Sequence, residues 1–338
     1  MKKIEFTAPG RAEIIDAARP VPREGQVLLR VKRVGVCGSD MQVFAGNNQY
    51  MTFPVTPFHE GILEVAEIPG AGSRLKPGMA AVVWPFINCG SCYPCRHGSP
   101  NACMNFTCLG IQTDGLGAEY YLSEEKYVYP LPEGLNPDEA VLIEPLSIGM
   151  HAAVRGDVTG KRVLVVGAGT IGNMTAQACK IKGAERVVVC DVAQEKITLA
   201  AASAIEGVNN QGKTLREVAH EVFGNPPDVV IDCAGFGPTT EQIFEIGGKT
   251  TTVVIVANSS RPISLLMNHI QRNELDVRGC IGSHPDDFRS AVNAVAKGKL
   301  NAGGFITARY EKMEQIQEMM EYSVSNRGSN MKTIMEMR

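Results

Sequence analysis

Two patterns of hydrophobic and polar residues divide the chain. From about residue 161 onward, short β-branched runs alternate with stretches that suit helices. The runs are RVLVVG, RVVVCD, DVVIDCAG and TTVVIVA, and the helical stretches include IGNMTAQACKIKG and TLREVAHEVFG. Fully apolar strands that alternate with helices predict an α/β fold with a doubly wound parallel sheet buried on both faces.

The first ~145 residues have a different texture, in which strand-like runs such as QVLLRVKRVGV and ILEVAEI lie between Gly and Pro residues. This pattern predicts a β-rich domain. After about Pro285 the chain returns to helical patterns, and it ends in the strand-like MKTIMEM. A length of 338 residues also favours two domains over one.

Composition and charge narrow the classes of partner. The chain is 44% hydrophobic and 20% charged, and its formal net charge of -3 comes without a long basic run. A nucleic-acid partner is therefore not expected. The N-terminal MKKIEFTAPGRAEII has no apolar segment typical of a signal peptide, and no apolar run reaches the roughly 18 residues of a membrane span. We expect a cytoplasmic protein that acts on a small molecule and has no membrane partner.

Four of the ten cysteines lie close together in NCGSCYPCRHGSPNAC. Without an export signal, metal binding explains such a cluster better than disulfides do. Cys89, Cys92, Cys95 and Cys103 have the spacing C-x2-C-x2-C-x7-C, which allows four thiolates to surround one zinc ion. An iron–sulfur cluster also takes four cysteines, but this spacing differs from the ferredoxin patterns. We predict a structural zinc with no open coordination position.

A glycine motif follows the first apolar strand of the second half. Gly167, Gly169 and Gly172 in VLVVGAGTIG match G-x-G-x-x-G, in which the glycines allow a tight turn and close approach of a pyrophosphate. Thr170 and Ile171 begin the expected helix, whose N-terminus attracts phosphate, and we include both in the predicted dinucleotide site.

An acidic residue supports this interpretation. Asp191 ends the second apolar strand, nineteen residues after Gly172, where a carboxylate would meet the ribose hydroxyls and repel a 2′-phosphate. We therefore predict NAD as the cofactor. The alternative role of Asp191 is to cap the next helix. Lys196 is either near the adenine ribose or a solvated helix lysine.

Three further segments each place a metal-binding side chain in a loop: GVCGSD with Cys37, PFHEG with His59 and Glu60, and LIEPLS with Glu144. Each residue alone has an ordinary structural explanation, such as a core thiol or a helix-start acid. Together they offer the thiolate, imidazole and carboxylates of a catalytic zinc that keeps one position open. Their spacing leaves both interpretations possible.

The order of these motifs resembles the zinc-containing medium-chain dehydrogenase/reductases, and within them the polyol (sorbitol or L-iditol) and threonine dehydrogenase branch. The resemblance covers almost the whole chain and includes GVCGSD, HEG, the four-cysteine loop, DGLGAEYYL, IEPLSIGMHAA, VLVVGAGTIG, VCD and GSNMKTIMEM. It implies a GroES-like catalytic domain of residues 1–150 and 285–338, with a Rossmann domain of residues 151–284 between its two parts. It also implies an active site in the cleft and a homodimer or homotetramer.

The resemblance further implies that Cys37, His59 and Glu144 hold the catalytic zinc, with Glu60 as a fourth or exchangeable ligand. Ser39 would relay a proton from the substrate through the cofactor ribose. Zinc would lower the pKa of a secondary alcohol, and hydride would pass to the nicotinamide to give a ketone and NADH. A polyol, sugar alcohol or sugar acid suits a site with a carboxylate ligand.

Two residues depart from the family pattern. Phe58 stands where the family usually has glycine before His-Glu, and it is expected to shift the His59 backbone or narrow the substrate side. Met79 replaces a residue of the usual GDRV and is expected to alter only local packing. The polar residues from Asn47 to Tyr50 are either substrate contacts or a surface turn.

Three other functions compete with polyol oxidation. A threonine-type 3-hydroxy amino acid dehydrogenase is the first alternative. A zinc-free enone or quinone reductase would not need Cys37, His59 and Glu144 together. A non-catalytic dinucleotide sensor is the third alternative, since a fold by itself does not determine a function.

Overall fold

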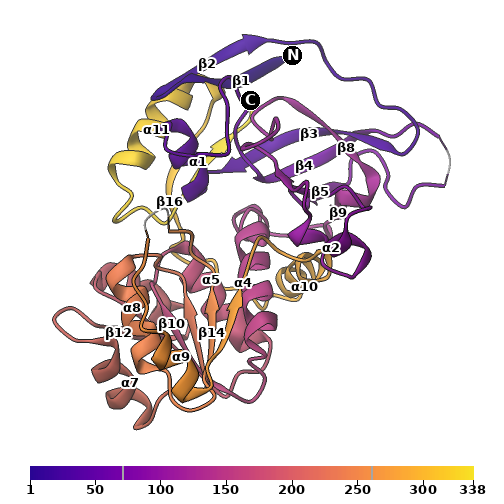
Figure 1. The fold of residues 1–338 in the computed structure, drawn as a ribbon. Coiled ribbons are helices and arrows are strands. Elements are labelled where there is room, and N and C mark those ends of the chain that lie inside the picture. The colour runs from indigo at the N-terminus through magenta and orange to yellow at the C-terminus, as the bar shows by residue number, and fades with distance from the viewer. Residues whose placement is uncertain (71, 260–261) are drawn as a thin grey trace. The chain divides into compact units, whose positions relative to one another are not determined.

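The computed structural model describes residues 1–70, 72–259 and 262–338, which form two compact units. The first unit is Met1–Glu144 together with Phe288–Arg338, and the second is Pro145–Asp287 (Figure 1). Two helices cross the divisions, namely α4 (Ile143–Gly156) and α10 (Pro285–Ala296). Within the described residues, no helix combines the length and the apolar character needed to cross a membrane.

The first unit is built on a seven-stranded sheet. Its strand order is β16-β17-β3-β4-β5-β9, and β8 also pairs with β3. The C-terminal strand β17 pairs antiparallel with β3, so the two sequence segments of this unit share one sheet. The bounds of these strands are Gln26–Gly35 (β3), Glu60–Glu67 (β4), Ala80–Val83 (β5), Tyr120–Glu124 (β8), Val128–Pro130 (β9), Ile306–Tyr310 (β16) and Lys332–Glu336 (β17).

Shorter elements complete this unit. Two small sheets pair β1 with β2 and β6 with β7. The strands are Lys2–Ala8 (β1), Arg11–Asp16 (β2), Phe86–Ile87 (β6) and Thr107–Cys108 (β7). The helices are Gly38–Phe44 (α1), Tyr93–Arg96 (α2), Pro137–Ala140 (α3) and Ile316–Ser325 (α11), with 3-10 turns at Pro100–Ala102 (η1), Glu125–Tyr127 (η2) and Met313–Gln315 (η3).

The second unit contains a six-stranded, all-parallel sheet of order β12-β11-β10-β13-β14-β15. Its strands are Arg162–Val166 (β10), Arg186–Asp191 (β11), Glu206–Asn209 (β12), Val229–Asp232 (β13), Thr252–Ile255 (β14) and Asp276–Gly279 (β15). The helices between them are Thr170–Ile181 (α5), Gln194–Ala202 (α6), Leu215–Phe223 (α7), Gly237–Ile246 (α8) and Met267–Asn273 (α9).

Both faces of this sheet are covered, as its apolar strands predict. Leu164 and Val166 of β10 join a core cluster that includes Val218 of α7 and Ile243 of α8. Val163 and Val165 alternate with them along the same strand, so they point to the opposite face, and both are fully buried. The strand order reverses beside β10, where the chain continues into the glycine loop and α5.

Candidate metal centres and dinucleotide site

The first candidate site lies where β3 and β4 meet. Cys37 follows β3 and precedes the first turn of α1, while His59 directly precedes β4 and Glu60 is its first residue. Since Gly35 of β3 pairs with Glu60 of β4, the two segments are held side by side. The thiol of Cys37, an imidazole nitrogen of His59 and a carboxylate oxygen of Glu60 all lie within 4.8 Å of one another.

The burial of these side chains and their unused hydrogen-bonding atoms suit a site that binds a cation. His59 is 5% exposed and Glu60 is fully buried. Within the described part of the chain, His59 Nδ1 and Glu60 Oε1 have no hydrogen-bond partner, and neither does the buried Oγ of Ser39. Buried polar atoms without partners are rare and costly, so they point to an absent ion, ligand or water. A thiolate, an imidazole and a carboxylate are the donors that zinc prefers.

Glu144 lies outside this compact group. It occupies the first turn of α4, is 6% exposed, and is close enough to His59 and Glu60 to interact with their charges. Burial raises the pKa of its carboxyl group to about 7, and the negative charge of Glu60 adds to this effect while His59 opposes it. The structure therefore brings together Cys37, His59 and Glu60, with Glu144 in the layer around them.

Asp40, which the sequence analysis left without a role, holds the two ligand-bearing segments together. Its fully buried carboxylate accepts the backbone N–H of Cys37 at 2.8 Å and that of Phe58 at 3.2 Å. It also lies 3.9 Å from His59 Nδ1. Burial alone would lower the pKa of His59, but the charge of Asp40, followed by that of Cys108, raises it well above its usual range.

Lys332 is the second residue that the sequence analysis missed. Its ammonium group is buried, donates to the Val36 carbonyl at 3.1 Å and forms an ion pair with Glu60 Oε2. Burial would lower the pKa of Lys332, but the charge and hydrogen bond of Glu60, together with the charges of Cys37 and Glu144, outweigh this effect and the pKa is raised. Lys332 thus engages one oxygen of Glu60, while the other, Oε1, remains without a hydrogen-bond partner among the described residues.

The departures from the family pattern have clear structural outcomes. Phe58 adopts a φ of +76°, the left-handed conformation that glycine enters easily, and its ring is fully buried. His59, the next residue, belongs to the compact group with Cys37 and Glu60. Met79 is half-buried, and its carbonyl accepts the N–H of Val65 at 2.8 Å in an ordinary backbone contact.

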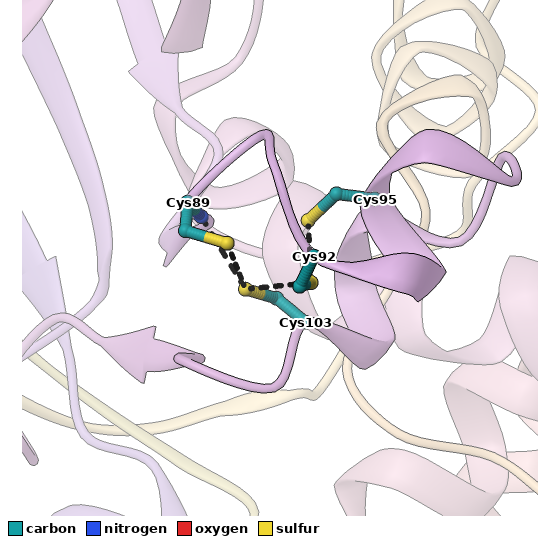
Figure 2. A group of neighbouring side chains, drawn as sticks. All are labelled: Cys89, Cys92, Cys95 and Cys103. Carbon is teal, nitrogen blue, oxygen red and sulfur yellow. Dashed lines mark hydrogen bonds between the residues drawn. The ribbon is translucent and has the colours of Figure 1, made fainter.

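The four-cysteine loop forms the second candidate metal site (Figure 2). The sulfur atoms of Cys92 and Cys95 are 3.4 Å apart, those of Cys92 and Cys103 are 3.8 Å apart, and those of Cys89 and Cys103 are 3.5 Å apart. Zinc–sulfur bonds of about 2.3 Å place two corners of a tetrahedron about 3.8 Å apart, whereas a disulfide brings sulfur atoms to about 2.0 Å. These spacings fit four thiolates around one ion.

Backbone N–H groups point at the sulfur atoms of this loop. Cys103 Sγ accepts from the N–H groups of Cys89 and Asn105, each at 3.3 Å. Backbone and side-chain hydrogen bonds from Ser91 lower the pKa of the Cys89 thiol to about 5, while burial raises that of Cys95 to about 12. Donors directed at sulfur stabilise thiolates, which are the form that binds metal.

The glycine motif runs from the end of β10 into the first turn of α5. Gly167 has a φ of +95°, and a Cβ at Gly172 would be 1.7 Å from the Gly167 carbonyl oxygen, so the turn requires small residues. The N-cap of α5 is Gly169, which has no side chain to cap the helix, and Thr170 and Ile171 form its first turn. The positive end of the helix dipole is thus available to an anion.

Asp191 links this turn to the end of β11. Its carboxylate accepts the N–H of Ala168 in the glycine loop at 2.8 Å and that of Ala193 at 2.9 Å. Asp191 therefore braces the loop and turns the chain toward α6, whose N-cap is Ala193. Each carboxylate oxygen retains a second acceptor site. Lys196 is half-buried on α6.

The polar loop after α1 is largely exposed. Tyr50 is 60% exposed, and its N–H is accepted by the side-chain carbonyl of Asn48 at 2.9 Å. Asn47 and Gln49 are also exposed.

Two family models match the chain. The alcohol dehydrogenase GroES-like domain matches residues 23–133, and the zinc-binding dehydrogenase domain matches residues 170–297. The chain belongs to the zinc-containing medium-chain dehydrogenase/reductase superfamily. It is accordingly an oxidoreductase of a zinc-dependent family that acts on alcohol groups, with a GroES-like domain and a Rossmann-like parallel sheet.

Relatives in this superfamily match nearly the whole chain. Sorbitol dehydrogenase 2 of Saccharomyces cerevisiae is 29% identical, with 94% of this chain and 93% of that protein covered. L-threonine 3-dehydrogenase of Pyrococcus furiosus is 28% identical, with 92% of this chain and 91% of that protein covered.

Solved structures agree. A short chain alcohol dehydrogenase of Escherichia coli CFT073 complexed with cofactor NADH is 28% identical, with a TM-score of 0.91 and 99% of both chains covered. A zinc-binding dehydrogenase of Sinorhizobium meliloti 1021 bound to NADP is 26% identical, with a TM-score of 0.90 over 99% of this chain and 98% of that chain.

Proposed function

We propose that this enzyme oxidises a secondary alcohol of a polyol, sugar alcohol or sugar acid to a ketone, with zinc as the metal and NAD as the hydride acceptor. The observation that carries the proposal is the group of half-buried Cys37 and buried His59 and Glu60, whose ligand atoms lie within 4.8 Å of one another. The hydrogen-bonding capacity of His59 Nδ1 and Glu60 Oε1 is unused among the described residues, as expected of side chains that face a cation.

In this proposal Cys37, His59 and Glu60 hold the catalytic zinc. Glu144 is an exchangeable ligand or contacts the zinc through a water molecule. When bound, zinc supplies a Lewis acid that lowers the pKa of a substrate hydroxyl. Ser39 takes the substrate proton and passes it on, which suits a buried hydroxyl without a hydrogen-bond partner in the described structure. Asp40 keeps Cys37 and His59 in register through the two backbone N–H groups that it accepts.

The dinucleotide is proposed to bind at the glycine turn. Gly167, Gly169, Thr170, Ile171 and Gly172 would receive the pyrophosphate at the start of α5. Asp191 would accept ribose hydroxyls with its remaining acceptor sites, and its negative charge disfavours the 2′-phosphate of NADP. NAD supplies the nicotinamide that accepts hydride. Lys196 on α6 is a secondary contact for the adenine ribose.

The four-cysteine loop is proposed to hold a second, purely structural zinc at Cys89, Cys92, Cys95 and Cys103. Four thiolates fill a tetrahedral shell, so no position remains for substrate. The loop between β6 and β7 contains only a four-residue helix and a short turn. The metal would supply the order that so small a segment lacks.

A threonine-type substrate is the alternative, and the similarity to an L-threonine 3-dehydrogenase supports it about as well as the sorbitol dehydrogenase supports a polyol. An ammonium group on the substrate would need a carboxylate or carbonyl in the pocket. For either substrate we expect a cytoplasmic homodimer or homotetramer.

The test is NADH formation across stereochemically complete polyols, sugar acids and sugar phosphates, with threonine and NADP as comparisons. We expect turnover with NAD on one group of secondary alcohols. Turnover on threonine alone would replace the polyol proposal with the alternative, and turnover with NADP alone would refute the cofactor assignment.

A matched pair of variants tests the metal site itself. Cys37→Ser should lose turnover and one zinc per chain while still binding NADH. Cys280→Ser, at a half-buried thiol of the other unit, should retain both. Full turnover of Cys37→Ser would overturn the zinc assignment. If the enzyme is active with only the zinc of the cysteine loop, a reductase without catalytic zinc is favoured. If it binds NADH but turns over no substrate, a non-catalytic sensor is favoured.

A further inference from the structure

Phe58 has a backbone conformation that residues with a large side chain rarely adopt. Its φ of +76° lies in the left-handed region, which a Cβ-bearing residue occupies only when its surroundings enforce it. Its ring is fully buried, and it directly precedes the two ligand residues His59 and Glu60. A strained backbone conformation persists only if the surrounding contacts stabilise it.

The backbone around Phe58 is enclosed on one side by a glycine-rich loop. The Phe58 carbonyl accepts the N–H of Leu116 at 2.8 Å, and the Pro57 carbonyl accepts that of Gly117 at 2.9 Å. A Cβ at Gly115 would be 2.1 Å from the Phe58 oxygen, and one at Gly110 would be 2.6 Å from its nitrogen. The loop therefore fits only the present path of the Phe58 backbone.

On the other side, the ring of Phe58 reaches the segment that carries Cys37. It packs edge-to-face on Phe6 at 6.2 Å between ring centroids, and Phe6 packs edge-to-face on Phe44 at 5.2 Å. Phe44 ends α1, the helix that begins directly after Cys37. The three rings thus connect both ligand-bearing segments through the hydrophobic core.

The same two segments are joined a second time by the carboxylate of Asp40. It accepts the N–H of Cys37 and the N–H of Phe58, which is directed at Asp40 in this left-handed conformation. If the Phe58 ring were removed, the backbone hydrogen bonds could keep this conformation, but the packing of the three rings that ties the segment to α1 would be lost. The distance between Cys37 and His59 would then be less tightly fixed.

We infer that Phe58 is a positioning residue whose buried ring, through Phe6 and Phe44, fixes His59 and Glu60 relative to Cys37 for metal binding. The inference rests on the proposed function, because it assumes a metal at these three side chains. It concerns the side chain of Phe58, a departure from the glycine that the family resemblance leads one to expect at this position.

The experiment measures metal retention in the full chain. Cobalt is loaded into wild type, Phe58→Gly, Phe58→Ala and Phe58→Leu, and its transfer to a chelator is followed together with the visible absorption bands. The metal of the four-cysteine loop serves as an internal reference in every sample. Phe305→Ala removes another fully buried ring from the same unit and is the matched control.

We expect the metal at Cys37, His59 and Glu60 to leave Phe58→Gly and Phe58→Ala roughly 10- to 100-fold faster than wild type, as when other outer supports of metal ligands are removed. Its absorption bands should change, the cysteine-loop metal should be unaffected, and Phe58→Leu should recover much of the retention. Phe58→Gly should melt at a higher temperature than Phe58→Ala, since glycine suits a positive φ, yet retain this metal no better.

Several results would overturn the inference. Wild-type retention in Phe58→Gly would show that only the backbone conformation matters, and equal metal loss in Phe305→Ala would show a general effect of lost stability. If the alanine variant does not fold, the comparison of Phe58→Leu and Phe58→Gly with wild type decides. A wild-type chain that binds only the cysteine-loop metal would refute the proposed function instead, so the two failures are distinguishable.

Discussion

Replacing Lys332 with methionine should destabilise the metal-free protein far more than the zinc-loaded protein. Lys332 and Glu60 form an ion pair whose side chains are 2% and 0% exposed. Methionine preserves most of the buried volume but leaves the carboxylate of Glu60 without a counter-charge. Removing one partner of a buried ion pair costs about 3–5 kcal/mol. A zinc ion at Cys37, His59 and Glu60 would replace the missing positive charge.

The assay is thermal unfolding of wild type and Lys332→Met, each with zinc and after chelation. For a unit of this size, 1 kcal/mol corresponds to about 2–4 °C, so we expect the chelated variant to melt roughly 6–20 °C below chelated wild type. With zinc bound, the difference should fall to less than half. Lys312→Met, at an exposed lysine, is the control and should change little in either state. An equal loss with and without zinc would refute the reasoning.

Three further predictions concern other parts of the chain. Cys95→Ser should lose the cysteine-loop zinc but keep the metal at Cys37, as metal analysis of the purified variant would show; loss of both metals would contradict separate sites. Asp191→Asn, which removes the charge but keeps an acceptor, should raise the affinity for NADP relative to NAD by roughly tenfold or more, measured by fluorescence titration; an unchanged ratio would count against the ribose role. A hydrogen bond from Arg309 lowers the pKa of Asp138, and the charge of Arg33 adds to this effect. The ionised carboxylate therefore stabilises the folded protein at pH values above its unfolded pKa of about 3.9. This stabilisation is lost as the pH falls through the lowered pKa of the folded state. Asp138→Asn should therefore cost about 1–2 kcal/mol in urea unfolding at pH 7 and much less near pH 3; a cost independent of pH would contradict the ion-pair explanation.

The α/β fold class and the superfamily predicted from the sequence are confirmed. The central strands β10, β11, β13 and β14 were predictable because a strand buried on both faces must be apolar throughout. The outer strands β12 and β15 gave no such signal. They form the edges of the sheet, where Glu206 and Asp276 are exposed to solvent, so their sequences lack an apolar run.

The candidate sites differ in how far the sequence predicts them. The four cysteines lie within one loop, so their spacing alone indicates convergence. Cys37, His59 and Glu60 come together because β3 pairs with β4, a long-range contact that spacing does not encode. Lys332 is 272 positions from Glu60, and its only signal was a charged residue inside the uncharged remainder of MKTIM, in a buried strand. Asp40 was visible in GVCGSD, but its role depends on the backbone path of Phe58.

Anomalous diffraction at the zinc edge from crystals of the purified enzyme tests the central claim most directly. The account predicts two strong peaks per chain, one among Cys37, His59 and Glu60 and one among the sulfur atoms of the four-cysteine loop. A single peak at the four cysteines, with the side chains of Cys37 and His59 turned away from each other, would contradict it.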